Sequence, residues 1–441
     1  MFTRKDLVKL IIPLIIEQVL GATIGIADTL MVAIAGEAVV SGVSLVDTLN
    51  ILLINVFSAF ATGGAIITSQ YLGRGDEKGA NTAAKQLVIA TTIVSLVLMV
   101  ICLPSTEGIL RLIYGNTEAD VMQSAKDYFF YSALSYPFIA SYNACTALFR
   151  SMNNTKVTMF TSGLINIVNV GGNALFIFGF GMGAAGAALA SLISRMLGTV
   201  ILFILLSGNG HVIHFDSFFP LRFDGGMIKN ILRIGVPNGL ENSMFQIGKI
   251  LVQGIVASFG TTAIAANAVA GSVASIAMMP GSAIGLATLT VVGRCIGAKD
   301  YKQAGGYMLK LTWISQAIVA GVNGLILVAM NPILTLYDLT PETAALAKQL
   351  LICACVIGIL FWSVSFTLPN GLRAANDVKF TMIIAIISMW VFRVGFGYVC
   401  SFWLGAGALG VWIGMGADWM FRLIVFIIRY ISGRWKNRQI I

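Results

Sequence analysis

Charged residues are scarce in this chain of 441 residues: they make up 11% of it, whereas hydrophobic residues make up 57%. A soluble globular protein carries roughly 25% charged residues. A chain this apolar would expose hydrophobic surface to water, so we expect a lipid bilayer to be its solvent. The composition therefore excludes an ordinary soluble protein, and no polar stretch is long enough to form a soluble domain.

Residues that carry covalent or metal chemistry are also few. The six cysteines are scattered through apolar runs, without the spacing of a disulfide framework or a zinc site. Both histidines, His211 and His214, lie in one loop, and we interpret them as surface residues. A phosphate-binding Gly-rich loop is missing, which argues against ATP as the direct energy source. We predict no enzyme activity, no cofactor and no resident metal.

Long apolar runs dominate the sequence instead. A spanning helix needs about 20 apolar residues, and the sequence predicts an all-α integral membrane protein with twelve transmembrane helices. The first of them carries Glu17 and Asp28, which a cleaved signal peptide would not. We place the spans at residues 10–34, 43–70, 85–104, 126–149, 157–180, 183–207, 230–258, 264–292, 309–330, 347–370, 379–402 and 405–430.

The positions of the basic residues predict the orientation. With the N-terminus inside, and with the ends of each span counted with the adjoining segment, inner segments hold 21 Lys and Arg residues and outer segments hold 3, while 4 lie deeper within spans. Basic residues stay on the cytoplasmic side of membrane proteins. We therefore expect a multi-pass protein of the cell (inner) membrane with both termini in the cytoplasm. The net charge of +9 follows from this topology, so we do not expect nucleic acid as a partner.

The two halves of the sequence repeat each other. At an offset of 224 residues Pro13 meets Pro237 and Glu17 meets Glu241. At an offset of 223, Arg150 meets Arg373, and the 224 offset returns at Gly183 and Gly407. Six spans per half give a parallel repeat, an arrangement typical of transporters that alternate access to a central site. The predicted organisation is an N-terminal six-helix lobe (residues 1–207), a cytoplasmic linker (208–229) and a C-terminal six-helix lobe (230–441), and we expect a monomer.

Ionisable residues at membrane depth are costly unless paired or hydrated, so each is a candidate functional residue. Glu17 and Asp28 lie three helical turns apart and share one face of the first span, about 16 Å apart. Glu17 and Glu241 recur four residues after a proline, either as fold architecture or as groups that attract cationic cargo. The others are Lys249, a candidate counter-ion of a carboxylate; Arg195 and Arg393, structural partners or cavity wall; and Asp418 and Arg422, spaced i, i+4 to pair.

Three asparagines, Asn166, Asn169 and Asn173, share one face of the fifth span. Buried amides must find partners. They either join helices or, with Asp28, form a cluster that binds a proton or another cation. A carboxylate that binds and releases a cation supplies the chemistry that an antiporter needs.

The sequence resembles the multidrug and toxic compound extrusion (MATE) family over nearly its full length. The resemblance rests on Ile12-Pro13 followed by Asp28-Thr29-Leu30-Met31-Val32, on Leu72-Gly73-Arg74-Gly75-Asp76, and on the run from Asn169 to Gly179; Gly183-Ala184-Ala185-Gly186 and Ile234-Gly235-Val236-Pro237 fit as well. It implies a two-lobe fold with a cavity open alternately to either side, and export of organic, often cationic, compounds driven by protons or sodium.

The family's functional residues fall on particular positions of this chain. The resemblance places the first-helix acid on Asp28, the fifth-helix polar pair on Asn169 and Asn173, and a helix-six hydroxyl near Ser191. Some members have Asp at the position of Asn173, and some have a seventh-helix Glu where this chain has Phe245. We assign the role of this seventh-helix Glu to Glu241.

The leading hypothesis is therefore a proton- or sodium-coupled antiporter that exports small organic, cationic compounds. The coupling ion, possible sodium included, is assigned to Asp28, Asn169, Asn173 and Ser191. We assign the substrate cavity to Glu17, Glu241, Lys249, Met244 and Gln246, with Phe245, Met278 and Met279 as further apolar wall. The alternative is a flippase for lipid-linked cell-envelope precursors, in which Arg195, Lys249 and Arg393 would bind a pyrophosphate. We do not favour a membrane enzyme or a receptor, because the sequence contains neither a catalytic cluster nor a signalling domain.

Overall fold

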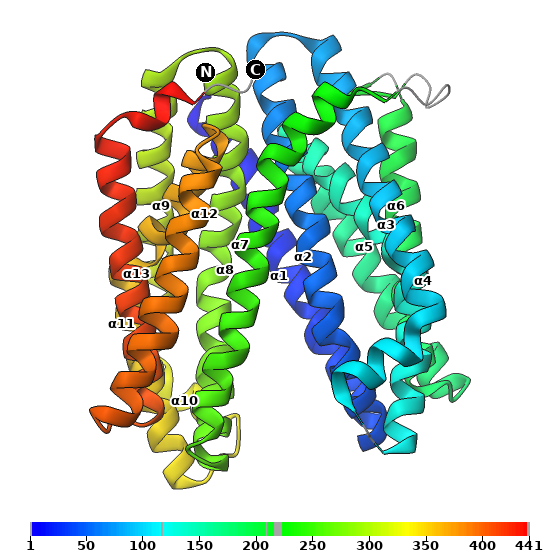
Figure 1. The fold of residues 1–441 in the computed structure, drawn as a ribbon, viewed down its shortest axis with the longest axis vertical. Helices are drawn as coiled ribbons and strands as arrows, with labels where there is room; N and C mark the ends of the chain where they lie inside the picture. Colours follow the sequence, from blue (N-terminus) through cyan, green and yellow to red (C-terminus); the bar gives the residue numbers. More distant parts are fainter. Residues whose placement is uncertain (1, 116–117, 209, 216–222, 439–441) are drawn as a thin grey trace. The chain divides into compact units, whose positions relative to one another are not determined.

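The computed structural model describes residues 2–115, 118–208, 210–215 and 223–438, and these residues are helical throughout, apart from short connections (Figure 1). Three stretches are π-helical (η1 to η3) and η4 is a 3-10 turn. In order, the elements are α1 (Arg4–Ile34), α2 (Glu37–Arg74), α3 (Glu77–Tyr114), α4 (Ala119–Ser151), α5 (Thr155–Asn173), η1 (Ala174–Gly179), α6 (Gly183–Ser207), α7 (Gly225–Ala257), α8 (Thr261–Gly297), α9 (Tyr301–Val328), α10 (Met330–Thr335), α11 (Pro341–Ala374), α12 (Val378–Ile387), η2 (Ser388–Phe396), η3 (Val399–Trp403), α13 (Ala408–Ile431) and η4 (Arg434–Asn437).

The prediction of an all-α protein with twelve spanning helices is confirmed. In the described part of the chain, α5 continues into η1 and α12 into η2 and η3, which leaves twelve helices of spanning length. Ten of them are long and apolar enough to qualify on composition alone. The other two, α4 and α7, have 33 residues each and are less apolar along their length. Most helices extend a few residues beyond the predicted spans and include the polar residues that flank them.

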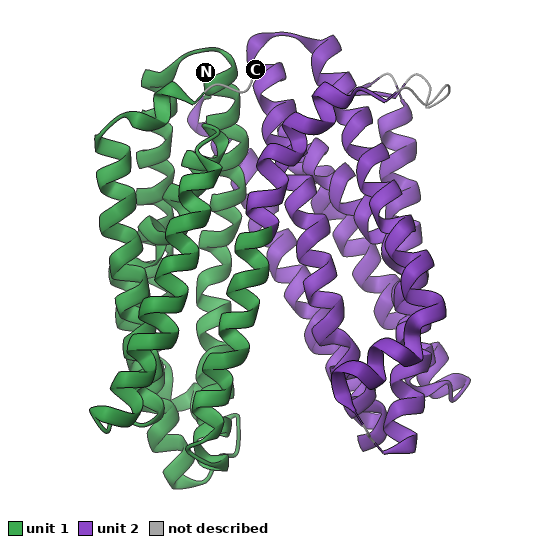
Figure 2. Cartoon of the chain, in the orientation of Figure 1, with its two compact units in different colours: residues 1–2, 240–441 green, residues 3–239 purple. Residues whose placement is uncertain are grey.

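The chain forms two compact units, coloured separately in Figure 2. Unit 2 comprises Thr3–Gly239, and unit 1 comprises Met1–Phe2 with Leu240–Ile441. The boundary at Gly239 and Leu240 lies within α7. The central part of the predicted linker, with Pro220 and Arg222, lies outside the described residues. The division at 1–207, 208–229 and 230–441 stays a prediction.

The sequence repeat also governs the connections between helices. Asp76 and Asp300 occupy equivalent positions, and each caps the helix that follows it: Asp76 accepts a hydrogen bond from the Gly79 amide (2.8 Å), and Asp300 from the Gln303 amide (2.9 Å). A side chain at this position satisfies a free N–H at the start of a helix. The repeated polar motif therefore begins α3 in unit 2 and α9 in unit 1.

Equivalent turns also share a left-handed backbone. Gly36 and Gly260, which precede α2 and α8, have φ of 124° and 92°. Asn153 and Asn376 have φ of 65° and 68°. Gly and Asn are the residues that tolerate positive φ best. These positions explain why Gly and Asn recur in register between the halves.

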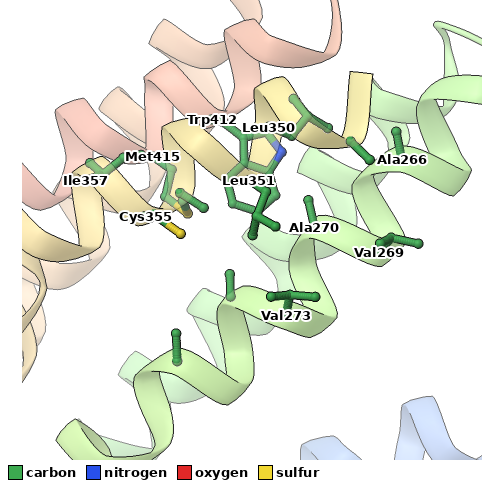
Figure 3. Close-up of a cluster of buried hydrophobic side chains, with 14 of the residues drawn as sticks. Ala266, Val269, Ala270, Val273, Leu350, Leu351, Cys355, Ile357, Trp412 and Met415 are labelled. Carbon is green, nitrogen blue, oxygen red and sulfur yellow. The ribbon is translucent and has the colours of Figure 1, made fainter. Parts of the chain in front are cut away.

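Each unit has its own apolar core. In unit 1, side chains of α8, α11 and α13 meet, and Figure 3 shows Ala266 and Ala270 of α8 facing Leu351 of α11 and Trp412 of α13. Alanines along α8 bring the helix backbones close, as is common in membrane proteins. In unit 2, α2, α3, α4 and α6 enclose Phe57, Phe129 and Tyr136, among others. Many large apolar side chains face outward, as expected of helices surrounded by lipid.

Candidate functional site

Helices α1 and α5 of unit 2 are joined along their length by polar contacts. The Thr155 hydroxyl donates to the Leu10 carbonyl (3.1 Å), the Thr158 hydroxyl to Glu17 Oε2 (2.7 Å), and the Asn173 amide to Asp28 Oδ1 (2.5 Å). The same 18 residues separate Leu10 from Asp28 and Thr155 from Asn173. The helices therefore run parallel for about 27 Å. The prediction that Glu17 and Asp28 share one face of the first helix is confirmed.

The four residues assigned to the coupling ion lie together. The Asn173 amide donates to Asp28 and lies 3.5 Å from Asn169 Oδ1, while the Asn169 amide donates to Ser191 Oγ on α6 (3.1 Å). Asn169 and Asn173 are buried, at 2% and 0% exposure, whereas Asp28 and Ser191 are half-buried. The structure thus connects α1, α5 and α6 through one chain of polar contacts.

Close packing brings α6 into this chain of contacts. Gly172 is next to Asn173, and a Cβ placed on Gly172 would lie 2.9 Å from the Cβ of Ala190 on α6. Only a residue without a side chain permits this distance. Ser191 follows Ala190 directly, so the small residues at this contact hold its hydroxyl near Asn169.

The chemistry of this cluster suits a small hard cation. Its side chains offer carboxylate, amide and hydroxyl oxygens, the ligands that hard cations prefer. Asn173 Oδ1 is buried and accepts no hydrogen bond from the described residues. Across those residues, no group of three or more His, Cys, Asp or Glu side chains is placed to hold a metal ion. A cation at Asp28 would therefore be bound mostly by neutral oxygens.

A second acid, Asp47 of α2, belongs to the same region, and the sequence reasoning missed it. Tyr128 of α4 donates to Asp47 Oδ1 (3.0 Å), and Tyr136 donates to the neighbouring Asn50 (3.0 Å). Asp47 is half-buried and close enough for its charge to act on Asp28. Its position inside the predicted second span, residues 43–70, was the available signal, because a lone carboxylate within a span is costly.

Arg195 of α6 supplies the positive charge of this region. Its guanidinium donates to Ser135 of α4 (2.7 Å), and its charge acts on both Asp28 and Asp47. Two carboxylates and one guanidinium give a net charge of −1 when all are ionised. One added cation would balance this charge.

Comparison with known proteins agrees with this architecture. The MatE family model matches residues 13–175 and 237–399, one stretch in each half and at the repeat offset of 224. The chain belongs to the MatE family.

Relatives of this MatE member cover nearly all of it. The chain is 28% identical to the Probable multidrug resistance protein NorM of Thermotoga maritima, over 99% of this chain and 94% of the relative. It is 29% identical to the Uncharacterized transporter YisQ of Bacillus subtilis, over 97% and 94%. The outward-facing structure of a multidrug resistance MATE family transporter of the MOP superfamily has a TM-score of 0.91 at 20% identity, covering 97% of this chain and 96% of that one. The MatE chain is thus a multi-pass membrane protein with the fold of these transporters.

Glu17 and Glu241, assigned to the substrate cavity, are both buried in ion pairs of this MatE chain. Glu17 binds Arg150 of α4, and Glu241 Oε1 lies 2.5 Å from Arg373 Nη2 of α11. Each glutamate is 7% exposed. Arg150 and Arg373 recur between the two halves, as Glu17 and Glu241 do. This joint recurrence was the sequence signal for the two ion pairs. Their role toward cargo stays a prediction, but a basic neighbour already balances each charge.

The other ionisable residues of unit 1 have mixed outcomes. The pairing of Asp418 with Arg422 is confirmed, at 2.7 Å. The counter-ion role of Lys249 is wrong: among the described residues no carboxylate pairs with it, because Arg373 holds Glu241, and the charge that acts on Lys249 is that of Arg393. Met244, Phe245 and Gln246 are half-buried on the same helix, and their contact with cargo stays a prediction.

A pocket of about 640 Å³ lies elsewhere in unit 2, between α3, α4 and α6. It is lined by Thr92, Pro137, Phe203 and Ile204, among others, and by none of the predicted site residues. The pocket and the polar cluster at Asp28 are therefore separate features.

Proposed function

We propose that this chain is a cation-coupled antiporter that exports small organic compounds by alternating access. The observation that carries the proposal is the joining of Asp28, Asn173, Asn169 and Ser191 in unit 2. A half-buried carboxylate among neutral oxygen ligands can exchange a proton or a sodium ion with water. The multidrug resistance names of several relatives support organic compounds as cargo.

The coupling works through the contact of α1 with α5. A proton or sodium ion at Asp28 cancels its charge and competes with the hydrogen bond from Asn173. The contact then favours a different packing of α1, and cargo affinity differs between the two packings. A ligand shifts such an equilibrium only by its difference in affinity for the two states. Ion entry and cargo exit are linked in this way without an enzymatic step.

The location follows from the distribution of basic residues. We propose that the chain lies in the cell (inner) membrane as a monomer with both termini in the cytoplasm, because inner segments hold 21 Lys and Arg residues against 3 outside. Cationic compounds are the proposed cargo, in keeping with the net negative charge of the region around Asp28. Membrane lipid is the other partner, and nucleic acid is not one.

The flippase alternative requires basic residues for a pyrophosphate. Arg195 is a poor candidate for binding a pyrophosphate, because the negative charges of Asp28 and Asp47 exceed its single positive charge. The observation that favours a flippase is the proximity of two basic residues, Lys249 and Arg393, in unit 1.

Efflux from cells without their own multidrug pumps tests the proposal. Cells that express the chain are loaded with ethidium, and the proton and sodium gradients are collapsed separately. We expect faster efflux than in control cells, abolished by the loss of one gradient. Efflux at the control rate, or efflux that neither gradient affects, would refute coupled export. A block in envelope synthesis on deletion, without any efflux, would favour the flippase.

A further inference from the structure

Unit 1 holds an excess of positive charge at membrane depth. Three basic side chains gather there: Lys249 of α7, Arg393 of η2 and Arg422 of α13. Among the described residues, Asp418 is the carboxylate that pairs with this cluster: it is 0% exposed and lies 2.7 Å from Arg422 Nε. Its second oxygen lies 3.8 Å from Arg393 Nη1, too far for a hydrogen bond. The cluster therefore carries two more positive charges than negative ones.

Arg393 packs against an aromatic ring, but one of its N–H groups has no hydrogen-bond acceptor among the described residues. Its guanidinium lies over the Phe245 ring, 5.3 Å from the centroid, and Arg422 lies 5.9 Å from the same ring. Arg393 Nη1 is buried and has no hydrogen-bond acceptor among the described residues. A buried donor without an acceptor is costly, and more so when it is charged. An anion beside Arg393 would remove this cost.

Lys249 gives the cluster access to the surface. Its side chain is exposed, and it lies one helical turn after Phe245, the ring over which the Arg393 guanidinium lies. Like charges repel, so neither stabilises the other. An oxygen-bearing anion that contacts Lys249 would therefore also lie near Arg393.

The repeat places this cluster where unit 2 has its acid. At the 224 offset Asp28 corresponds to Val252, and Lys249 lies three residues, about one helical turn, before Val252. Asn169 corresponds to Arg393 at the same offset. An acid with neutral amides in one unit is thus replaced by two basic residues in the other.

The π-helical segment η2 explains how Arg393 reaches this place. The repeat offset changes from 223 at Met159 and Met382 to 224 at Gly183 and Gly407, so unit 1 has one extra residue between them. The nine-residue η2 lies in this interval, whereas η1 and η3 are matching short segments. A π-turn accommodates one extra residue in a helix and is frequent at functional sites.

We propose that unit 1 contains a binding site for an oxyanion, the carboxylate or phosphate group of a small amphiphilic molecule. Arg393 and Lys249 bind the anion, while Asp418, Arg422 and Phe245 position Arg393. The planar guanidinium suits two oxygens at once and the ammonium adds a point charge. The anion belongs either to a free organic compound or to a lipid headgroup. Binding requires neither a gradient nor Asp28, so this site stands independently of the antiport.

Binding to the purified full chain in a neutral, phosphate-free detergent tests the site. Tryptophan fluorescence is followed during titration with benzoate, phenyl phosphate and short-chain phosphatidylglycerol, with benzamide and short-chain phosphatidylcholine as their controls. We expect at least one of the first three to bind about tenfold or more tightly than its control. Benzoate or phenyl phosphate would indicate a free organic anion, and phosphatidylglycerol alone a lipid headgroup.

Variants then assign the binding to the cluster. We expect Lys249→Gln, which changes an exposed residue and does not threaten the fold, and Arg393→Gln each to weaken anion binding about tenfold and leave benzamide binding unchanged. Arg393→Lys keeps the charge and retains part of the affinity. Lys310→Gln, an exposed lysine of α9, is the control for the loss of one charge and binds like wild type. Equal affinity for the anions and their controls, or equal losses in Lys249→Gln and Lys310→Gln, would overturn the proposal.

Discussion

The Asn173 amide donates a hydrogen bond of 2.5 Å to Asp28, although 145 residues separate the two in the chain. This bond joins α5 to α1 at the point where a carboxylate would otherwise lie at membrane depth without a partner. Since Asn173 Oδ1 accepts no hydrogen bond from the described residues, the amide can offer this oxygen to a cation. The pair is thus a structural contact and, in our proposal, the coupling site.

Replacing Asn173 with Asp tests which cation the cluster prefers. A second carboxylate next to Asp28 strengthens the attraction for sodium, because two anions close together are stabilised by a cation between them. We expect Asn173→Asp to lower the sodium concentration for half-maximal efflux about tenfold in proteoliposomes. Asn166→Asp, on the same helix face, is the control, because the Asn166 amide donates to the Ser162 carbonyl within α5 (3.0 Å) and not to the residues assigned to the coupling ion. A sodium dependence unchanged from wild type would count against ion binding at Asn173.

The ion pair between Glu17 and Arg150 is expected to stabilise unit 2. Removing one partner leaves a buried charge without compensation, which costs about 3 kcal/mol or more. We expect Glu17→Gln and Arg150→Met each to lower the thermal unfolding midpoint in detergent, and the double variant to lose less than the sum. The same cycle on Glu241 and Arg373 is the matched test in unit 1. Strictly additive losses in both cycles would show that the pairs do not contribute as pairs.

Gly414 of α13 packs directly against Gly397. A Cβ on Gly414 would lie 2.6 Å from the Gly397 Cα, so α13 would have to move away. We expect Gly414→Ala to destabilise the protein by about 1–3 kcal/mol, the usual cost of overpacking. Gly254→Ala of α7, where nothing lies within 4 Å, is the control and should not lower the unfolding midpoint, because Ala favours a helix more than Gly does. Equal midpoints for the two variants would contradict the close helix contact.

Much of the fold followed from the sequence because lipid imposes strict rules on it. Apolar length predicted the twelve helices, and the repeat predicted two halves of six helices each. The side-chain spacing on single helices was also informative: it predicted the Asp418–Arg422 pair and the shared face of Glu17 and Asp28.

Contacts between helices were harder to predict. The proximity of Asp28, Asn169, Asn173 and Ser191 came from family resemblance, because spacing along one helix does not show which helix lies next to it. Asp47 was missed for the same reason, since its partner Tyr128 lies 81 residues away. The π-helical turns were not predicted either, although the change of offset from 223 to 224 marked the extra residue.

The exchange of Asp28 for Asn tests the central claim most directly, because it removes the charge and preserves the shape. Purified wild type, Asp28→Asn and the exposed control Asp120→Asn are reconstituted into liposomes, and ethidium transport is measured under an imposed proton or sodium gradient. We predict that the gradient accelerates transport by wild type and Asp120→Asn and leaves Asp28→Asn at least tenfold slower. Transport by Asp28→Asn that responds to the gradient as wild type does would contradict the assignment of the coupling ion to Asp28.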